Sequence, residues 1–264
     1  MCSQKISVVT PSFNQGRYIE RTIRSVRSGP PNSVEHIIID GGSSDNTLEI
    51  IRRYADALVY WVSEPDRGQS HAINKGFSRS TGDILCWLNS DDYFLDDSLS
   101  YVSHFFEINR DADVLCGGVR LVNADGDLLF ELPAKFEGRE QLIRYWHGYH
   151  MHQPSIFWRR RVYETIGGVN ERLHLSMDYD YWIRMAARFE IHVVDRPLSN
   201  ATLHSDQKTA DGFVGYRRAQ LRNIAHYLGS PFSIRDWPLR LMFYRHLIGS
   251  GARIILRRPN VYGL

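Results

Sequence analysis

The chain has 264 residues, 43% of them hydrophobic and 23% charged, and a formal net charge of +2 at pH 7. This composition is ordinary for a globular protein, and the balanced charge argues against a nucleic-acid partner, because dedicated nucleic-acid binders are usually more basic. The three scattered cysteines suit neither a disulfide framework nor a cysteine zinc site. The sequence also has no membrane-length apolar run and no apolar signal segment before the first predicted strand, so we expect a cytoplasmic protein.

The first half of the chain alternates between strand and helix patterns. Short apolar, β-branched runs predict strands, and apolar residues at helical spacing predict the helices between them. This alternation predicts right-handed β-α-β units, and therefore an α/β fold with a mainly parallel sheet flanked by helices. The predicted strands are residues 6–10, 36–39, 58–62 and 84–88, and the predicted helices are residues 18–26, 47–54 and 69–78.

Beyond residue 110 the pattern is less regular. Two apolar runs, at residues 114–122 and 128–132, flank a turn at 123–126 and predict a β-hairpin. From residue 215 the chain becomes helical and rich in arginine. The other predicted elements are helices at 140–146 and 179–189 and strands at 155–158 and 192–194.

Each predicted strand of the first half ends in a polar, turn-forming segment. In open α/β sheets, ligands bind beyond the carboxyl ends of the strands. We therefore expect these segments to form one site. They are Thr10 to Asn14, Asp40 to Asp45, Glu64 to Gln69, and Asn89 to Asp92.

The last of these segments places two carboxylates, Asp91 and Asp92, at the exit of a buried strand. Carboxylate oxygens suit hard cations such as Mn²⁺ and Mg²⁺, which in turn bind phosphate oxygens. An alternative is a turn, or an N-cap for a helix predicted at residues 94–106.

The four segments, in this order, resemble the bacterial family 2 glycosyltransferases, over roughly residues 5–210. The resemblance implies a GT-A fold and inverting transfer, of the hexosyltransferase type, from a nucleotide-sugar to a hydroxyl acceptor in polysaccharide or cell-surface glycan synthesis. It also implies a glycosyltransferase domain at 1–212, with a nucleotide-sugar half at about 1–110 and an acceptor half at about 111–212, followed by a basic helical extension at 213–264.

A nucleotide-sugar needs groups that bind its base, ribose and diphosphate. Asp40 could accept a hydrogen bond from a pyrimidine imide N–H, or could be a turn residue; Phe13 could pack on the base or in the core. Arg67 and Lys75 could contact phosphate, or could be surface side chains. The resemblance implies that Asp40, Arg67 and Asp91 contact the nucleoside. The predicted nucleotide-sugar residues are Thr10, Pro11, Phe13, Asn14, Asp40, Asp66, Arg67, Lys75, Asn89 and Asp91.

The metal motif departs from the family pattern of Asp-x-Asp, because its first position is the amide Asn89. Asp91 and Asp92 remain as predicted ligands for Mn²⁺ or Mg²⁺, and which of them binds directly is left open. The resemblance adds His204 as a third ligand, although a lone histidine is more often structural.

The segment from Met177 to Trp182 resembles the family's Glu-Asp motif, with Met177 in place of the glutamate. The resemblance implies that Asp178 is the base that takes the proton of the attacking hydroxyl. Asp178 could instead be a helix N-cap, and Asp180 is the competing candidate on the acceptor side. His152 and Gln153 resemble a family loop near the acceptor, or form a turn ahead of a strand.

The expected partners are a nucleotide-sugar donor, with a UDP-sugar as the family's commonest case, and a saccharide or lipid-linked saccharide. Residues 232–258 mix arginine with aliphatic and aromatic side chains, which suits either peripheral contact with a membrane or packing on the domain or on a second subunit. The alternative functions are a non-catalytic nucleotide-sugar-binding or assembly protein and a nucleotidyltransferase. The latter's usual Gly-rich basic loop is missing from residues 11–16.

Overall fold

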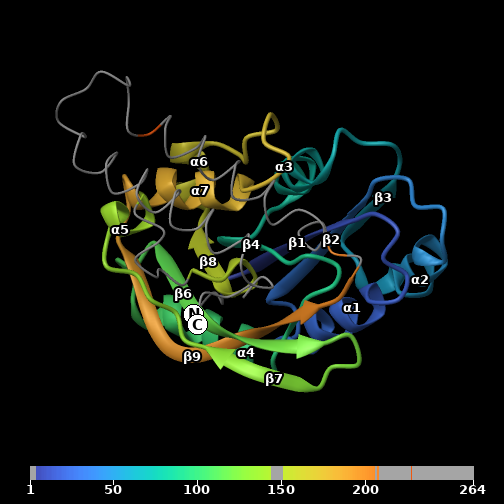
Figure 1. Ribbon diagram of the computed structural model, residues 1–264, viewed down its shortest axis with the longest axis horizontal. Helices are drawn as coiled ribbons and strands as arrows, with labels where there is room; N and C mark the ends of the chain where they lie inside the picture. Colours follow the sequence, from blue (N-terminus) through green and yellow to red (C-terminus); the bar gives the residue numbers. More distant parts are fainter. Residues whose placement is uncertain (1–3, 144–150, 206, 208–226, 228–264) are drawn as a thin grey trace, which may run out of the picture.

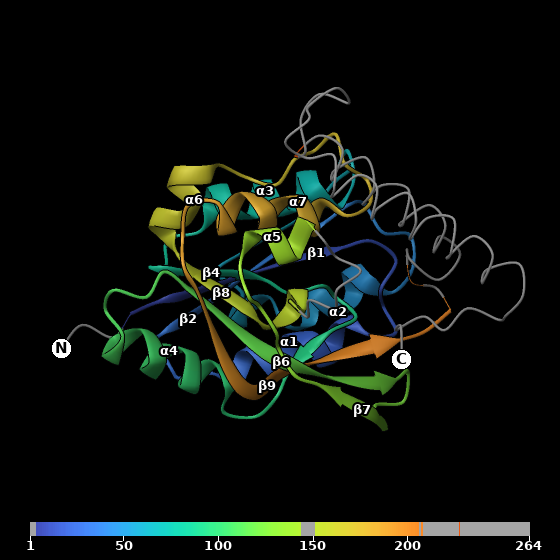
Figure 2. The same ribbon diagram turned by 60° about the vertical axis from the view of Figure 1, so that its left-hand side comes forward.

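The structure, a computed structural model, describes residues 4–143, 151–205, 207 and 227. In this part of the chain, one sheet forms the centre of the molecule and helices cover both of its faces (Figure 1 and Figure 2). The strands are β1 (Ile6–Ser12), β2 (Val34–Asp40), β3 (Tyr60–Ser63), β4 (Ile84–Trp87), β5 (Tyr93–Phe94), β6 (Val114–Asn123), β7 (Leu128–Leu132), β8 (Ile156–Arg159) and β9 (Ile191–Leu203). The helices are α1 (Ile19–Arg27), α2 (Thr47–Arg53), α3 (Gln69–Arg79), α4 (Ser98–Ile108), α5 (Arg139–Ile143), α6 (Arg160–Ile166) and α7 (Met177–Ala186), with 3-10 turns at η1 (Ala55–Ala57) and η3 (Gln153–Ser155).

The sheet order is β3-β2-β1-β4-β8-β6-β9-β5, with β7 paired to β6. All pairings among β1 to β4 are parallel, as predicted, and β8 enters antiparallel between β4 and β6. The register aligns Ser12 with Asp40 and Asp40 with Ser63, so the carboxyl ends of β1, β2 and β3 lie level. The segments that follow these strands therefore begin at one edge of the sheet.

An aromatic cluster attaches α7 to the middle of the sheet. Trp87 of β4 stacks on Trp182 of α7, with ring centroids 5.1 Å apart and planes 5° apart. Trp158 of β8 meets both rings edge-on, and all three indoles are buried. Large aromatic side chains bury much apolar area in a defined geometry. The cluster thus fixes the middle of α7 against the end of β4.

Most predicted elements are confirmed, with shifted ends, and the helix predicted at 94–106 is confirmed as α4, with its start shifted to Ser98. The first residue of the predicted helix, Phe94, instead belongs to β5, where it is buried and pairs with Ser199 of β9. Asp91 and Asp92 are therefore not N-cap residues of that helix. β1 also continues through Pro11, because β4 pairs with β1 only as far as Val9 and the missing proline N–H breaks no ladder there.

The strand predicted at 192–194 is far too short. β9 runs through Pro197 and the buried polar residues Ser199, Asn200 and Thr202, and it pairs with β6 as far as Leu203. The polar composition of this segment hid it from a search for apolar runs. β9 ends directly before His204. Helix α6 was not predicted, and residues 144–146 of the predicted helix 140–146 lie outside the described residues.

A buried carboxylate joins the opposite, amino-terminal end of the sheet. Glu35 of β2 is fully buried and accepts hydrogen bonds from Ser7 Oγ (2.5 Å), from the Thr81 N–H (2.5 Å) and from the Gly82 N–H (3.2 Å), and it pairs with Lys5 Nζ (2.5 Å). Burial by itself would raise the pKa of this carboxyl, but the bonds from Lys5, Ser7 and Thr81 outweigh it and lower the pKa to about 2.

We expect Glu35 to make folding stability depend on pH. Its folded-state pKa lies below the usual 4.5, so the stabilisation is complete above pH 4.5 and is lost as the pH falls towards 2. The pKa difference corresponds to roughly 3 kcal/mol. Urea unfolding of wild type and Glu35→Gln should give a stability difference that is large at pH 7 and shrinks by pH 3. Glu107→Gln, the same change at an exposed position of α4, serves as the control. A difference that stays constant across this range would contradict the assignment.

Within the described residues, no helix has both the length and the apolar character needed to span a bilayer. The extension predicted at 213–264 lies outside the described residues, apart from Tyr227. The hydroxyl of Tyr227 donates to Asp180 Oδ1 (2.7 Å).

Candidate active site

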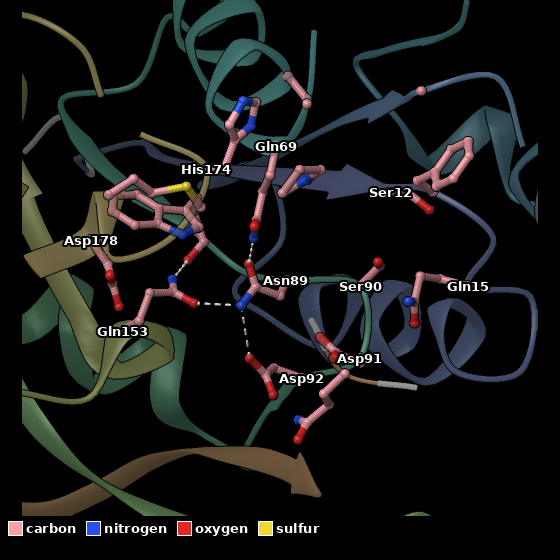
Figure 3. Close-up of a pocket in the computed structure, with 18 of the residues that line it drawn as sticks. Ser12, Gln15, Gln69, Asn89, Ser90, Asp91, Asp92, Gln153, His174 and Asp178 are labelled. Atoms are coloured by element: carbon pink, nitrogen blue, oxygen red, sulfur yellow. Dashed lines mark hydrogen bonds between the residues drawn. The ribbon is translucent and has the colours of Figure 1, made fainter. Parts of the chain in front are cut away.

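The segments that follow β1, β2, β3 and β4 converge on one cavity of about 620 Å³, as predicted, and the start of α7 closes its far side (Figure 3). This volume lies in the range typical of small-molecule sites. The cavity is lined by Pro11, Ser12, Phe13, Gln15, Gly41, Asp66, Gly68, Gln69, Ala72, Trp87, Asn89, Ser90, Asp91, Asp92, Gln153, His174, Leu175, Ser176, Met177, Asp178 and Gln207.

The predicted site residues divide into two groups. Those on the cavity wall are Pro11, Phe13, Asp66, Asn89, Asp91, Asp92, Gln153 and Asp178. Those that do not line it are Thr10, Asn14, Asp40, Arg67, Lys75, His152, Asp180 and His204.

Several of the second group have structural partners. Arg67 is exposed and pairs with Glu171 (2.7 Å), and Lys75 pairs with Glu64. These pairings match the surface alternatives for both side chains. Thr10 is buried against His36, with 2.9 Å between Thr10 Oγ1 and His36 Nε2. The other contacts are those of Asn14 Oδ1, which accepts from the Ser44 N–H (2.9 Å), and His152 Nε2, which faces the Pro133 carbonyl at 3.3 Å.

Asp40 is fully buried and its carboxylate is occupied. One oxygen accepts from Ser43 Oγ (2.5 Å), and the other from the N–H groups of Gly42 and Ser43 and from Ser63 Oγ. These bonds shape the turn after β2. The structure thus places Asp40 in its turn-forming alternative, and its side chain does not line the cavity.

Asp66 presents a carboxylate on the cavity wall close to Gly41. A Cβ added to Gly41 would lie 2.9 Å from Asp66 Oδ2 and 3.4 Å from the ring of Phe13. Phe13 is 60% exposed, so its ring is not a core residue. Asp66 Oδ1 is held by the N–H of Gly68 (2.6 Å). We call Phe13, Gly41 and Asp66 the base corner, because Phe13 is the ring predicted to pack on the base of the nucleotide.

The structure brings Asp91 and His204 together. His204 Nε2 lies 3.1 Å from Asp91 Oδ2, and the imidazole is 3% exposed and stacks on Tyr18, with ring centroids 4.3 Å apart. β9 delivers this histidine, because it begins the segment after Leu203. His204 Nδ1 is buried and has no partner among the described residues.

Asp92 also lines the cavity but is buried and bonded to the backbone of β9. It is 6% exposed, and its Oδ1 accepts from the Thr202 N–H of β9 (3.1 Å). Burial, and then the charge of Asp91, raise the pKa of this carboxyl well above its usual value. The two neighbouring acids therefore have different environments, and only Asp91 is paired with His204.

Three side-chain amides form a hydrogen-bonded chain across the cavity wall (Figure 3). Gln153 Nε2 donates to the carbonyl of Trp87 (2.6 Å), Asn89 Nδ2 donates to Gln153 Oε1 (2.9 Å), and Gln69 Nε2 donates to Asn89 Oδ1 (2.8 Å). Asn89 Nδ2 also reaches Asp92 Oδ2 at 3.4 Å. The amide at the first motif position thus links α3, β4 and η3.

Asp178 is the acid of α7 that lines the cavity, in the first turn of that helix. Asp180 is 5% exposed and is held by Arg184 Nε (2.9 Å) and by Tyr227. The structure therefore brings Asp178 to the site and leaves Asp180 behind it. Met177, at the place of the family's glutamate, accepts a hydrogen bond from Ser70 Oγ through its sulfur (2.9 Å).

Sequence reasoning missed several wall residues. Ser12, Gly41 and Gln69 belong to segments already identified at strand ends, so the strand-end rule could have included them. His174 and Gln207 belong to segments between elements, and no local pattern singled them out.

The donor set suits a divalent cation, although no group of three or more His, Cys, Asp or Glu residues within the described part of the chain is arranged to hold one. Two ligands of one ion, each bound at about 2.1 Å and at right angles, lie about 3 Å apart, which is the separation of His204 Nε2 and Asp91 Oδ2. Mg²⁺ commonly takes one or two protein ligands and completes its shell with substrate phosphates and water. The residues therefore fit a metal shared with a diphosphate.

The sequence matches the model of the family described as glycosyl transferase family 2 over residues 7–167. An uncharacterized glycosyltransferase of Mycobacterium tuberculosis is 33% identical over 188 residues, which is 69% of this chain and 68% of that protein. The chondroitin synthase of Pasteurella multocida is 27% identical over 206 residues, which is 76% of this chain but only 21% of that enzyme.

Two solved structures share the fold. The crystal structure of S. aureus TarS 1-349 in complex with UDP-GlcNAc superposes with a TM-score of 0.66 at 18% identity, covering 87% of this chain and 68% of that one. The mannosyltransferase PcManGT from Pyrobaculum calidifontis in complex with GDP-Man and Mn²⁺ gives a TM-score of 0.60 at 15% identity, covering 97% and 81%.

Proposed function

The chain belongs to glycosyl transferase family 2, and from this premise we propose that it transfers a sugar, with inversion, from a nucleotide-diphosphate-sugar to a hydroxyl of a saccharide or lipid-linked saccharide. The observation that carries the proposal is the single cavity whose wall carries the base corner, Asp178 and Asp91, the last of which is paired with His204 behind it. In the view of Figure 3, Ser12 and Gln15 lie on one side, Asp178 lies on the other, and Gln69 and Asn89 lie between them.

In the proposed reaction, the acceptor hydroxyl attacks the anomeric carbon opposite the leaving diphosphate. Asp178 takes the proton of that hydroxyl as the new glycosidic bond forms. A divalent cation held by Asp91 and His204 would neutralise the developing diphosphate charge. The buried Asp92 supports this site through the backbone of β9, because it accepts the Thr202 N–H two residues before His204.

The proposal gives base recognition to Asp66 rather than to Asp40, and the geometry of the base corner supports it. Asp66 Oδ2 faces the space above Gly41, and Phe13 offers an exposed ring to pack on a base. A carboxylate oxygen accepts hydrogen bonds, so the corner suits a base with a ring N–H on its edge, such as uracil, thymine or guanine. Adenine and cytosine lack such a ring N–H.

We expect Asp66→Asn and Asp40→Asn, the same acid-to-amide change, to have opposite consequences. Asp66→Asn should weaken UDP binding by roughly 10- to 100-fold, since a hydrogen bond to a charged group is lost. Asp40→Asn should lower the melting temperature and leave UDP affinity nearly intact. Thermal shift and calorimetry with UDP, GDP, dTDP, ADP and CDP measure both effects, because a ligand that binds only the folded state raises its stability.

Gly41→Ala adds a second test of the corner, because its Cβ would displace Asp66. Unchanged UDP affinity in both Asp66→Asn and Gly41→Ala would show that the base binds elsewhere. Wild-type protein that bound none of the five nucleotides, and released none from sugar donors with Mn²⁺ and saccharide acceptors, would overturn the proposed function itself.

A further inference from the structure

The direction of the amide chain is fixed by one backbone atom. The carbonyl of Trp87 can only accept a hydrogen bond, so the side-chain group of Gln153 that faces it at 2.6 Å must be Nε2. Gln153 Oε1 then faces Asn89, which must donate through Nδ2, and Asn89 Oδ1 must accept from Gln69 Nε2. Every amide in the chain is thereby oriented, without any choice between oxygen and nitrogen.

All polar atoms of Asn89 are used by this arrangement. Its oxygen accepts from Gln69, and its two N–H groups serve Gln153 Oε1 and, at 3.4 Å, Asp92 Oδ2. An aspartate at this position would have no hydrogen for either oxygen and would add a charge beside a buried carboxyl. The amide is therefore required by its neighbours, although it departs from the acid-x-acid pattern.

The row of hydrogen-bonded amides ends at Gln69, whose Oε1 is left as a hydrogen-bond acceptor on the cavity wall. Within the described residues, no group donates to this oxygen. Gln69 is the first residue of α3 and is only half-buried. Since its Nε2 is committed to Asn89, Oε1 can serve only a ligand group that carries a hydrogen, and the commonest such group on a saccharide is a hydroxyl.

The position of Gln69 points to the sugar of the donor. It lies three residues after Asp66 of the base corner and contacts Asn89, two residues before Asp91. In Figure 3 it lies between the side of Ser12 and Gln15 and that of Asp178. A donor whose base is in the corner and whose diphosphate is at Asp91 would place its sugar in this interval.

We propose that Gln69 Oε1 accepts a hydrogen bond from one hydroxyl of the donor sugar, and that Asn89 and Gln153 are positioning residues that hold Gln69 in this orientation. The inference rests on the proposed function, because it requires a bound nucleotide-sugar. With this hydrogen bond, the protein would distinguish donor sugars by the position of a hydroxyl, which the motif residues do not do.

The test combines a substitution with donors that lack one hydroxyl. The parent donor is whichever of UDP-glucose, UDP-galactose, UDP-N-acetylglucosamine and GDP-mannose the wild type uses, together with its 3-, 4- and 6-deoxyfluoro analogues. Fluorine retains the size of the hydroxyl but cannot donate a hydrogen bond. At one position, wild type should lose roughly tenfold or more in kcat/KM, as expected when a hydrogen bond is lost and a polar group stays unpaired.

Gln69→Met keeps the side-chain length and removes the amide. It should lose a similar factor with the parent donor and show no further loss with the analogue that affects wild type. Gln141→Met, the same change on α5 outside the cavity, should behave as wild type. Asn89→Asp should also lose the preference for that hydroxyl. This result would not follow from a merely structural role, because structural damage lowers kcat/KM for all donors by one common factor.

Binding of UDP and GDP separates this inference from the proposed function. Neither nucleotide carries a donor sugar, so calorimetry should give the same affinity for wild type and Gln69→Met. If the nucleotides bind and transfer occurs, but Gln69→Met lowers kcat/KM equally for the parent donor and every analogue, the inference is overturned and the proposed function stands. The inference is likewise overturned if coupling appears only with deoxyfluoro acceptors, or if Asn89→Asp keeps the preference. If the wild type binds neither nucleotide, both the inference and the proposed function are overturned.

Discussion

Asp178→Asn should reduce the rate of sugar transfer by roughly 10²–10⁴-fold while leaving donor binding almost unchanged. The substitution keeps the shape of the side chain and removes its ability to take a proton, and the loss of a general base typically costs that much. Asp178 is the acid of α7 on the cavity wall, opposite the segments expected to hold the donor. The measurements are single-turnover transfer with saturating donor and calorimetric binding of the nucleotide.

Asp180→Asn is the matched control, because it makes the same change two residues further along the same helix. Asp180 is held by Arg184 and Tyr227 beneath the surface, so its substitution should lower the melting temperature by several degrees and affect the rate of the folded protein much less. If Asp180→Asn were the more damaging change for catalysis, the assignment of Asp178 as the catalytic base would be wrong. An α-configured product from an α-linked donor would eliminate the inverting mechanism.

Removing divalent metal should abolish transfer, and Mn²⁺ or Mg²⁺ should restore it. Charge stabilisation by a metal supplies several kcal/mol to a transition state, so Asp91→Asn and His204→Gln should each reduce kcat/KM by roughly 10²-fold or more. Asp91 and His204 are two predicted ligands whose side chains are paired directly, with 3.1 Å between Asp91 Oδ2 and His204 Nε2.

The control for this prediction is Asp125→Asn, which neutralises an exposed carboxylate on the β6–β7 turn. A second measurement does not depend on catalysis: the electron paramagnetic resonance signal of free Mn²⁺ should fall when wild type and UDP are added, and should fall less with Asp91→Asn. Full activity in excess chelator, or Mn²⁺ binding that survives both substitutions, would refute the metal site.

The sequence predicted the location of the site more accurately than it predicted which side chains line the cavity. The strand-end rule located all four segments, because parallel strands must end at a common edge. It could not distinguish Asp40 from Asp66, since both are acids in polar turns. Only the fold shows that the turn after β2 uses Asp40 internally, whereas Asp66 reaches over Gly41.

Other features depend on contacts between residues far apart in the chain. The amides of Gln69, Asn89 and Gln153 come from α3, the end of β4 and η3, so no local motif could connect them. β9 was underestimated for a different reason. Its buried Ser199, Asn200 and Thr202 satisfy their backbone groups through pairing with β6, which a scale of side-chain hydropathy does not register.

The stacked indoles of Trp87 and Trp182 give the protein an optical signal of its own. Their rings are parallel, 5.1 Å apart and shielded from solvent, and aromatic side chains in fixed packing give near-ultraviolet circular dichroism that is lost when the packing is lost. Trp87 belongs to the cavity wall and Trp182 to the helix that carries Asp178. The spectrum of the unlabelled protein therefore monitors how α7 sits against the sheet while ligands enter and leave.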